Sequence, residues 1–221
     1  MKKLGFALMG LLMISSTSAF AQASFGVKAG LNFSNMNAKY AGNKDDDAKF
    51  KPGINIGAFA DIAFSDMLGL ETGLNIETKG NMYKDKDEEE VLGTKIKTKY
   101  KQTTNILYFT IPVDVKLTFG NIYVLAGPYV GIAATGKTKM KSEFDGHEDK
   151  HDESLEFGND EGKSNLKRLD AGLGVGAGYE INDNLGVRLG YDLGLSNLLP
   201  GGDKDNSVKN GSINIAATFK F

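Results

Sequence analysis

The stretch that decides the fold is GSINIAATFKF, residues 211–221 at the end of the chain. Two kinds of side chain alternate along it with a period of two, as in a β-strand whose faces meet different surroundings. The same alternation in FGVKAGLNFS, residues 25–34, predicts the first strand. In the last strand one face carries Ile213, Ile215, Ala217, Phe219 and Phe221, and the other carries Ser212, Asn214, Ala216, Thr218 and Lys220.

The same period predicts six further strands, near residues 53–64, 67–80, 103–119, 121–137, 167–181 and 185–197. The connections alternate in length. Residues 65–67, 120–121 and 182–184 are short turns, and residues 36–52, 81–102, 138–166 and 198–208 are long and polar. Eight antiparallel strands in an up-and-down meander follow from this pattern. The segment 121–137 is apolar on both faces, so alternation does not orient it.

The beginning of the chain predicts a signal peptide over residues 1–21, followed by one barrel domain over residues 22–221. Lys2 and Lys3 precede an apolar run, residues 4–14, and a small-x-small site closes at Ala21. The apolar run is too short for a membrane-spanning helix, which needs about 20 residues.

Composition narrows the class of protein further. The 28 glycines disfavour helices, and the chain has no cysteine for a disulfide framework. Without Lys2 and Lys3, 24 basic residues stand against 28 acidic ones, so no basic excess points to nucleic acid.

Two closed architectures share the period of two: a soluble lipocalin-like barrel and a membrane barrel with its apolar face toward lipid. The polar face here is largely Gly, Ala, Asn and Ser with isolated charges, which suits the narrow interior of eight strands. We therefore favour an all-β, eight-stranded antiparallel up-and-down transmembrane β-barrel. Its lumen is predicted to hold a polar network of Lys28, Asp61, Glu71, Glu77, Asp114, Lys116, Asp170, Glu180, Arg188, Asp192 and Lys220.

Longer stretches resemble a known group of proteins. IPV at residues 111–113 followed by YVLAGPYVG at residues 123–131 is the most specific part, together with a signal peptide and a terminal Phe. These features resemble the PorT-like or outer-membrane β-barrel families of Bacteroidetes type. The resemblance implies the outer membrane of a Gram-negative cell and, for some members, assistance in protein secretion. It also implies that Phe219 and Phe221 form the signal read by the barrel-assembly machinery.

One motif points elsewhere. HEDKH, residues 147–151, matches the H-E-x-x-H signature of zinc proteases. That signature needs a helix that places both histidines on one face, whereas this segment lies in the longest predicted loop and has no apolar helical stripe. A loose cation site is the weaker alternative, with Asp145, His147, Asp149 and His151 as candidate ligands.

The predicted function is that of a non-enzymatic integral outer-membrane protein without a cofactor, in a structural, surface-interaction or PorT-like secretion-accessory role. The alternatives are a small passive porin-like channel and a soluble lipocalin-like periplasmic binder. The expected partners are outer-membrane lipid and lipopolysaccharide, with the barrel-assembly machinery during biogenesis.

Overall fold

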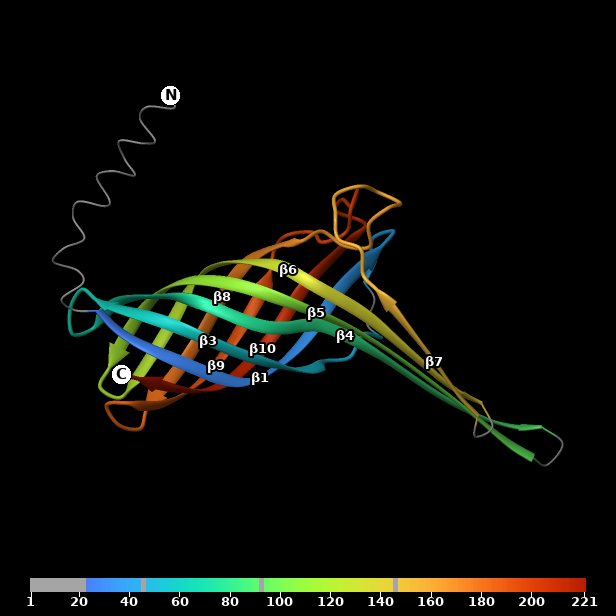
Figure 1. Ribbon diagram of the computed structural model, residues 1–221, viewed down its shortest axis with the longest axis horizontal. Helices are drawn as coiled ribbons and strands as arrows, with labels where there is room; N and C mark the ends of the chain where they lie inside the picture. The colour runs from blue at the N-terminus through green and yellow to red at the C-terminus, as the bar shows by residue number, and fades with distance from the viewer. Residues whose placement is uncertain (1–22, 45–46, 92–93, 145–146) are drawn as a thin grey trace, which may run out of the picture.

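Eight antiparallel strands close into a ring in the computed structural model, which describes residues 23–44, 47–91, 94–144 and 147–221 (Figure 1). The order around the ring is β1, β3, β4, β5, β6, β8, β9 and β10, and β10 pairs with β1 to close it. This confirms the predicted fold class. The predicted signal peptide lies outside the described residues.

The ring strands overlap the eight predicted strands, but β1 continues to Tyr40, inside the predicted loop 36–52. Two short strands, β2 and β7, lie beside the ring. The bounds are β1 Ala23–Tyr40, β2 Asn43–Lys44, β3 Lys51–Ala63, β4 Leu68–Val91, β5 Thr94–Phe119, β6 Ile122–Phe144, β7 His147–Ser154, β8 Leu169–Glu180, β9 Leu185–Gly194 and β10 Ser207–Lys220.

Three tight turns form one end of the barrel, which we call the turn end. At the β3–β4 turn the backbone N–H of Phe64 donates to the carbonyl of Leu68 at 2.8 Å. At the β5–β6 turn Gly120 has a φ of 61°, in the left-handed region that favours glycine. At the β8–β9 turn the Asn182 side chain accepts a hydrogen bond from the N–H of Leu185 at 2.8 Å. Phe221 also lies here, where its N–H donates to the carbonyl of Phe25.

The outer face of the ring is apolar, which excludes the soluble lipocalin-like alternative because that fold would place these side chains inside. Leu31, Ile56, Val175 and Leu189 are all more than half exposed, and similar side chains continue around the ring. The described residues include no helix long and apolar enough to cross a membrane.

Apolar inward residues and a β-bulge together explain why alternation does not orient the segment 121–137. Tyr123, Leu125 and Tyr129 point inward at odd positions, and Ile132 points outward. The register then shifts: Tyr108 pairs with Ala133 and Leu107 with Thr135, so Ala134 is an extra residue. Beyond it the inward positions of β6 are even, and no single alternation describes the whole segment.

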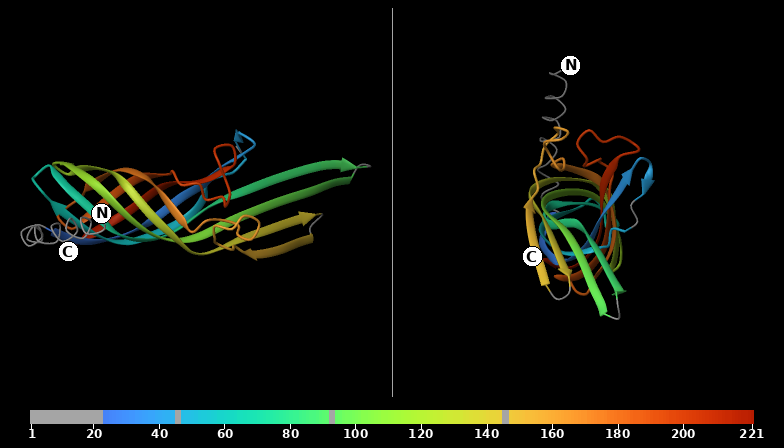
Figure 2. Two further views of the ribbon diagram at one scale, coloured as in Figure 1. Left: turned by 90° about the horizontal axis from the view of Figure 1, so that it is seen from above. Right: turned by 90° about the vertical axis from the view of Figure 1, so that its right-hand side faces the viewer.

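The predicted long loops 81–102 and 138–166 are corrected by the structure, because much of both is strand. β4 and β5 continue as a paired ladder up to Val91 and Thr94, and β6 continues to pair with β7. These extensions form a four-stranded sheet that projects well beyond the barrel (Figures 1 and 2). We call this sheet the blade: residues 81–91 of β4, 94–104 of β5 and 137–144 of β6, with β7. Both of its faces are polar, so the hydrophobic alternation that reveals the other strands is absent here.

Candidate functional site in the barrel lumen

The lumen is filled by charged side chains in three successive groups, and the first lies at the turn end. Lys116 from β5 and Lys220 from β10 each contact both Asp61 from β3 and Glu180 from β8. The Lys116–Glu180 distance is 3.6 Å and the Lys220–Asp61 distance is 3.5 Å. Four strands far apart in the sequence are thus joined across the barrel by alternating charges.

The second group is centred on Arg188 of β9. Its guanidinium donates to both carboxylate oxygens of Glu71 on β4, each at 2.7 Å. Its Nε donates to the hydroxyl of Tyr123 at 3.2 Å, and the group also lies 5.6 Å from the ring centre of Phe59. A paired guanidinium of this kind satisfies a buried carboxylate that would otherwise be costly to hold in the lumen.

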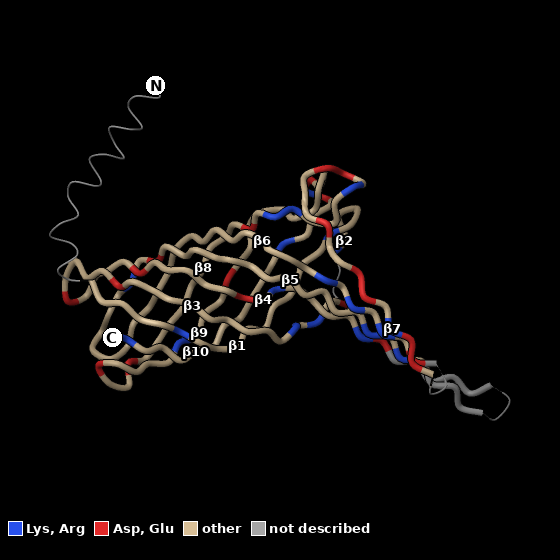
Figure 3. The backbone as a smooth tube through the Cα atoms, viewed as in Figure 1, with Lys and Arg blue, Asp and Glu red and all other residues tan. Residues whose placement is uncertain are grey.

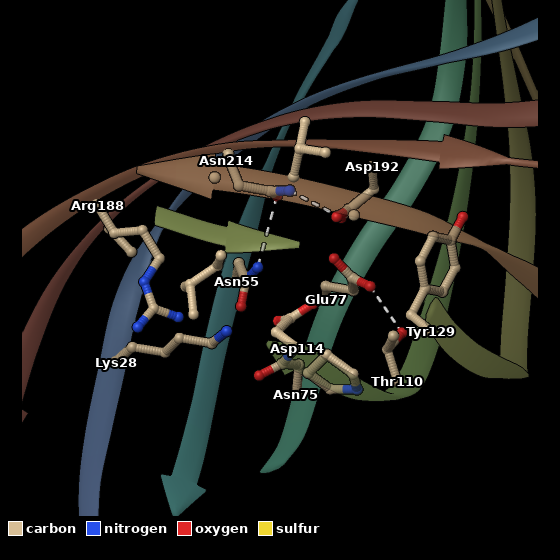
Figure 4. A pocket seen from close by; sticks show the side chains of 17 residues that line it. Lys28, Asn55, Asn75, Glu77, Thr110, Asp114, Tyr129, Arg188, Asp192 and Asn214 are labelled. Carbon is tan, nitrogen blue, oxygen red and sulfur yellow. Dashed lines mark hydrogen bonds between the residues drawn. The ribbon is translucent and has the colours of Figure 1, made fainter. Parts of the chain in front are cut away.

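Beside Arg188 lies a polar cavity of about 70 Å³ (Figure 4). Lys28, Asp114 and Asp192 line it, and the Asn214 side chain donates to Asp192 at 2.8 Å. Pockets for small organic ligands are typically about 300–1,000 Å³. This cavity therefore suits a few water molecules rather than a ligand or a solute path.

The third group surrounds Lys79 of β4, which is fully buried. Its Nζ lies 3.1 Å from Glu77 and 3.3 Å from Asp170, and 4.4 Å from the ring centre of Tyr129. Asn210 donates to Asp170 at 2.9 Å. The predicted network did not include Lys79. This residue lies an even number of positions from Glu71 and Glu77 on the same strand, so its side chain also points inward, and it adds a fifth base to the network.

The structure places all eleven predicted network residues on the lumen side of the ring, in these three groups and the cavity between them. The charged residues of the groups come from β3, β4, β5, β8, β9 and β10, whereas Lys28 comes from β1 and lines the cavity.

An apolar cluster closes the lumen at the end opposite the turns, and sequence reasoning missed it. We call it the plug: inward side chains of the strands meet residues of the β7–β8 and β9–β10 connections. Leu198 and Ile106 are fully buried within it. The available signal was the presence of isolated leucines and a phenylalanine in otherwise polar connections. The plug consists of Met36, Ala38, Ile106, Tyr108, Ala133, Leu166, Leu198 and Val208, with Leu155, Phe157 and Leu199 packed against them.

The HEDKH segment is a β-strand, neither the helix of a zinc protease nor the predicted loop. All of β7 from His147 to Ser154 is exposed and pairs with β6. With a rise of about 3.3 Å per residue, the backbone positions of His147 and His151 are about 13 Å apart. The described residues hold no group of three or more metal-ligating side chains that could share an ion. Asp145, the fourth candidate, lies outside the described residues.

The two aromatic residues of the predicted assembly signal lie at the turn end on the outside of the ring. The rings of Phe219 and Phe221 meet edge to face, 5.6 Å apart, and Phe221 is 76% exposed. Phe219 pairs with Val27 across the strand pair that closes the barrel.

Comparisons with known proteins assign the chain to a family. A search of curated protein sequences found no match. Among solved structures the chain is similar to Ail, the attachment invasion locus protein of Yersinia pestis in complex with the heparin analogue sucrose octasulfate (16% identity, 90% of this chain and 99% of that chain covered, TM-score 0.42). It is also similar to Neisserial surface protein A (14% identity, 90% and 99% covered, TM-score 0.37) and to OprG from Pseudomonas aeruginosa (18% identity, 90% and 96% covered, TM-score 0.35). The family described as outer membrane protein beta-barrel domain matches residues 20–199, so the chain belongs to this family and is a protein of the outer membrane.

Proposed function

We propose that this protein is a closed, non-enzymatic outer-membrane barrel that acts through its exposed surface rather than by letting solutes pass. The observation that carries the proposal is the filled lumen: three groups of paired charges followed by the apolar plug. An eight-stranded barrel is only just wide enough for its own side chains. A hydrated ion would have to break buried ion pairs and then cross an apolar layer.

The blade supports a surface role. Outer-membrane barrels carry short turns on the periplasmic side and long connections outside the cell. The blade projects from the end of the barrel opposite the turns (Figure 2), so it reaches out from the cell. Strands that continue from the barrel wall hold it in place, which makes it a more rigid contact element than a loop of equal length.

We include the PorT-like secretion-accessory role in this proposal as one specific form. Its support is the sequence resemblance over residues 111–113 and 123–131, which lie in the walls formed by β5 and β6. Deletion of the gene would then leave secreted cargo behind in the periplasm. Normal secretion by the deletion strain would exclude the PorT-like secretion-accessory role and leave the general surface role.

Planar-bilayer recording of the refolded protein tests the closed lumen. We expect no conductance steps above those of a bilayer treated with detergent alone, while a known porin in the same membrane gives steps. Regular single-channel steps from folded protein would establish the passive channel instead. Folding is verified on gels, where the compact unboiled barrel and the boiled chain migrate differently.

A further inference from the structure

Lysines are gathered on one face of the blade. Along β5 and β6 they occupy alternate positions, so that Lys99 and Lys101, and likewise Lys139 and Lys141, point to the same side. Figure 3 shows basic positions on the strands of the blade, with acidic positions among them. We call this side the lysine face, and its members are Lys84, Lys99, Lys101, Lys137, Lys139, Lys141 and Lys150, all exposed.

The strand register places four of these lysines in one row across the blade. Lys84 pairs with Lys101, Lys101 with Lys141, and Lys141 with Lys150. Like charges directly opposite each other on a sheet are destabilising. Such a row needs negative charge close by.

The acids on the lysine face meet only part of that need. Glu148 lies 2.8 Å from Lys141 and 3.2 Å from Lys150, and Glu143 lies 2.9 Å from Lys99. Among the side chains that the structure describes, no carboxylate lies within 4 Å of the ammonium groups of Lys84, Lys101 or Lys137. A cleft of about 330 Å³ runs along Lys84, Lys99, Lys101 and Lys141. Three carboxylates, Asp85, Glu143 and Glu148, also line it, so four ammonium groups stand against three acids. The volume of the cleft accommodates phosphate groups carried on a sugar.

The opposite face of the blade carries acidic and aromatic side chains in place of lysines. Register and alternation place Asp85, Tyr100, Asp149 and Glu153 there, and none of the described side chains on that face is a lysine. The lysines therefore belong to one face and are not a general coating that keeps the sheet soluble.

The lysine face continues directly from the lipid-facing side of the barrel. On β5, Phe109 and Leu107 are apolar residues of the outward side, and Asn105, Thr103 and Lys101 follow on the same side. On β6 Lys137 lies five residues beyond the outward Ile132. With a rise of about 3.3 Å per residue and a strand tilt of about 40°, these lysines lie about 10–20 Å above the apolar band. Phosphorylated sugars of the outer leaflet occupy that layer.

We propose that the lysine face binds the phosphate groups of lipopolysaccharide in the outer leaflet around the barrel. Its position next to lipid favours a membrane-anchored polyanion over a soluble one. The inference rests on the outer-membrane location and not on the closed lumen, so a conducting lumen would leave it intact.

The test compares two triple variants with equal loss of charge. Lys84→Gln, Lys101→Gln and Lys137→Gln remove the lysines that have no ion pair with any side chain the structure describes. The control, Lys44→Gln, Lys163→Gln and Lys204→Gln, changes exposed lysines of the other connections at the same end of the barrel. Each protein is refolded in zwitterionic detergent and checked for heat-modifiable mobility. It is then titrated with phosphorylated lipopolysaccharide, with dephosphorylated lipopolysaccharide and with a soluble sulfated polysaccharide.

The native protein and the control are expected to bind phosphorylated lipopolysaccharide equally well at low salt, and the lysine-face variant roughly 100-fold more weakly. Dephosphorylated lipopolysaccharide should bind the native protein as weakly as the variant binds the phosphorylated form. Equal affinity of the variant and the native protein would overturn the proposal. The proposal would also be overturned if the lysine-face variant no longer bound the soluble polysaccharide but still bound lipopolysaccharide as the native protein does. Should the variant fail to fold, equal binding of both lipopolysaccharides by the native protein would be the refuting result.

Discussion

Glycines on β8 make room for large side chains that β6 sends into the lumen. A Cβ on Gly172 would lie 2.7 Å from the ring of Tyr129, and a Cβ on Gly178 would overlap the ring of Tyr123. Tyr123 cannot easily move away, because Arg188 donates to its hydroxyl and Lys116 lies 4.4 Å from its ring centre. Gly172 and Gly178 are therefore a packing requirement of the lumen.

Gly178→Ala is accordingly expected to lower the free energy of unfolding by about 1–3 kcal/mol, the usual cost of overpacking. Gly174→Ala is the matched control on the same strand and face. The nearest atom to its new Cβ would be Oδ1 of Asp192, at 3.2 Å, which can shift, and the next atoms lie at 3.9 Å or more. Urea unfolding of the refolded barrel, followed by circular dichroism because the chain has no Trp, measures both. Equal midpoints for the two variants would show that Tyr123 is not held as described.

The buried pair of Glu71 and Arg188 gives a second prediction at this scale. Glu71→Ala leaves the guanidinium in the lumen without its carboxylate, and the loss of one partner of a buried pair costs about 3–5 kcal/mol. Asp66→Ala, in the exposed β3–β4 turn, removes the same charge outside the lumen and should change stability little. The same unfolding measurement applies. A small loss for Glu71→Ala would mean that water or the carboxylate of Asp114, which lines the same cavity as Arg188, takes the place of the Glu71 carboxylate.

Single residues also mark the limit of prediction from sequence. Along each strand, residues with inward side chains are every second residue. Alternation in the sequence was therefore enough to name the charges of the network. Lys79 also has an inward position but lies at the end of its predicted strand, next to an expected loop. The plug depends on contacts between Leu166, Leu198 and strand residues far away in the chain, and no local pattern encodes such contacts.

Among the elements, the blade shows where hydrophobic periodicity fails. A sheet with water on both sides has no apolar face, so its strands look like loops in a hydropathy pattern. The alternation that remains is one of charge, Lys-x-Lys-x-Lys at residues 97–101 and 137–141. It would have predicted both strands and the face on which the lysines lie.

The pairing of β6 with β7 should depend on pH through Glu148. Hydrogen bonds from Lys141 and Lys150 hold the pKa of the Glu148 carboxyl below its ordinary value of 4.5. A carboxyl whose pKa is lowered in the folded state stabilises that state above the ordinary pKa, and the contribution is lost as the pH falls through the lowered value. Backbone chemical shifts of β7 in micelles, followed from about pH 7 to about pH 3, should therefore report loosening only at the acid end.

Glu148→Gln should remove most of this dependence, whereas Glu153→Gln, on the opposite face of β7, should retain it. If the native shifts do not change across the range, or if both variants behave alike, the ion pairs do not contribute to holding β7 in place.

For the whole molecule, the ring closes where the first and last strands pair, so a stable barrel requires that the chain be complete through β10. The closing ladder runs from Gly26 paired with Lys220 to Lys39 paired with Ser207. Phe221 adds little to it, since its backbone N–H makes one hydrogen bond to the ring and its side chain, apart from the edge of Phe219, is mostly exposed. An aromatic side chain with so small a part in the folded state is a candidate for a role before folding is complete.

We therefore predict that Phe221→Ala separates assembly from stability. The purified variant should refold in detergent with an unfolding midpoint close to the native one, because an exposed side chain loses little contact on truncation. In cells, its amount in the outer membrane should fall several-fold if the assembly machinery reads this aromatic residue.

Phe64→Ala is the matched control, an exposed phenylalanine in the β3–β4 turn at the same end of the barrel. Membrane fractionation with heat-modifiable mobility measures both. Native levels of the Phe221 variant in the outer membrane would assign the assembly signal to other residues of β10, with Phe219 the first to examine because it lies within the closing ladder.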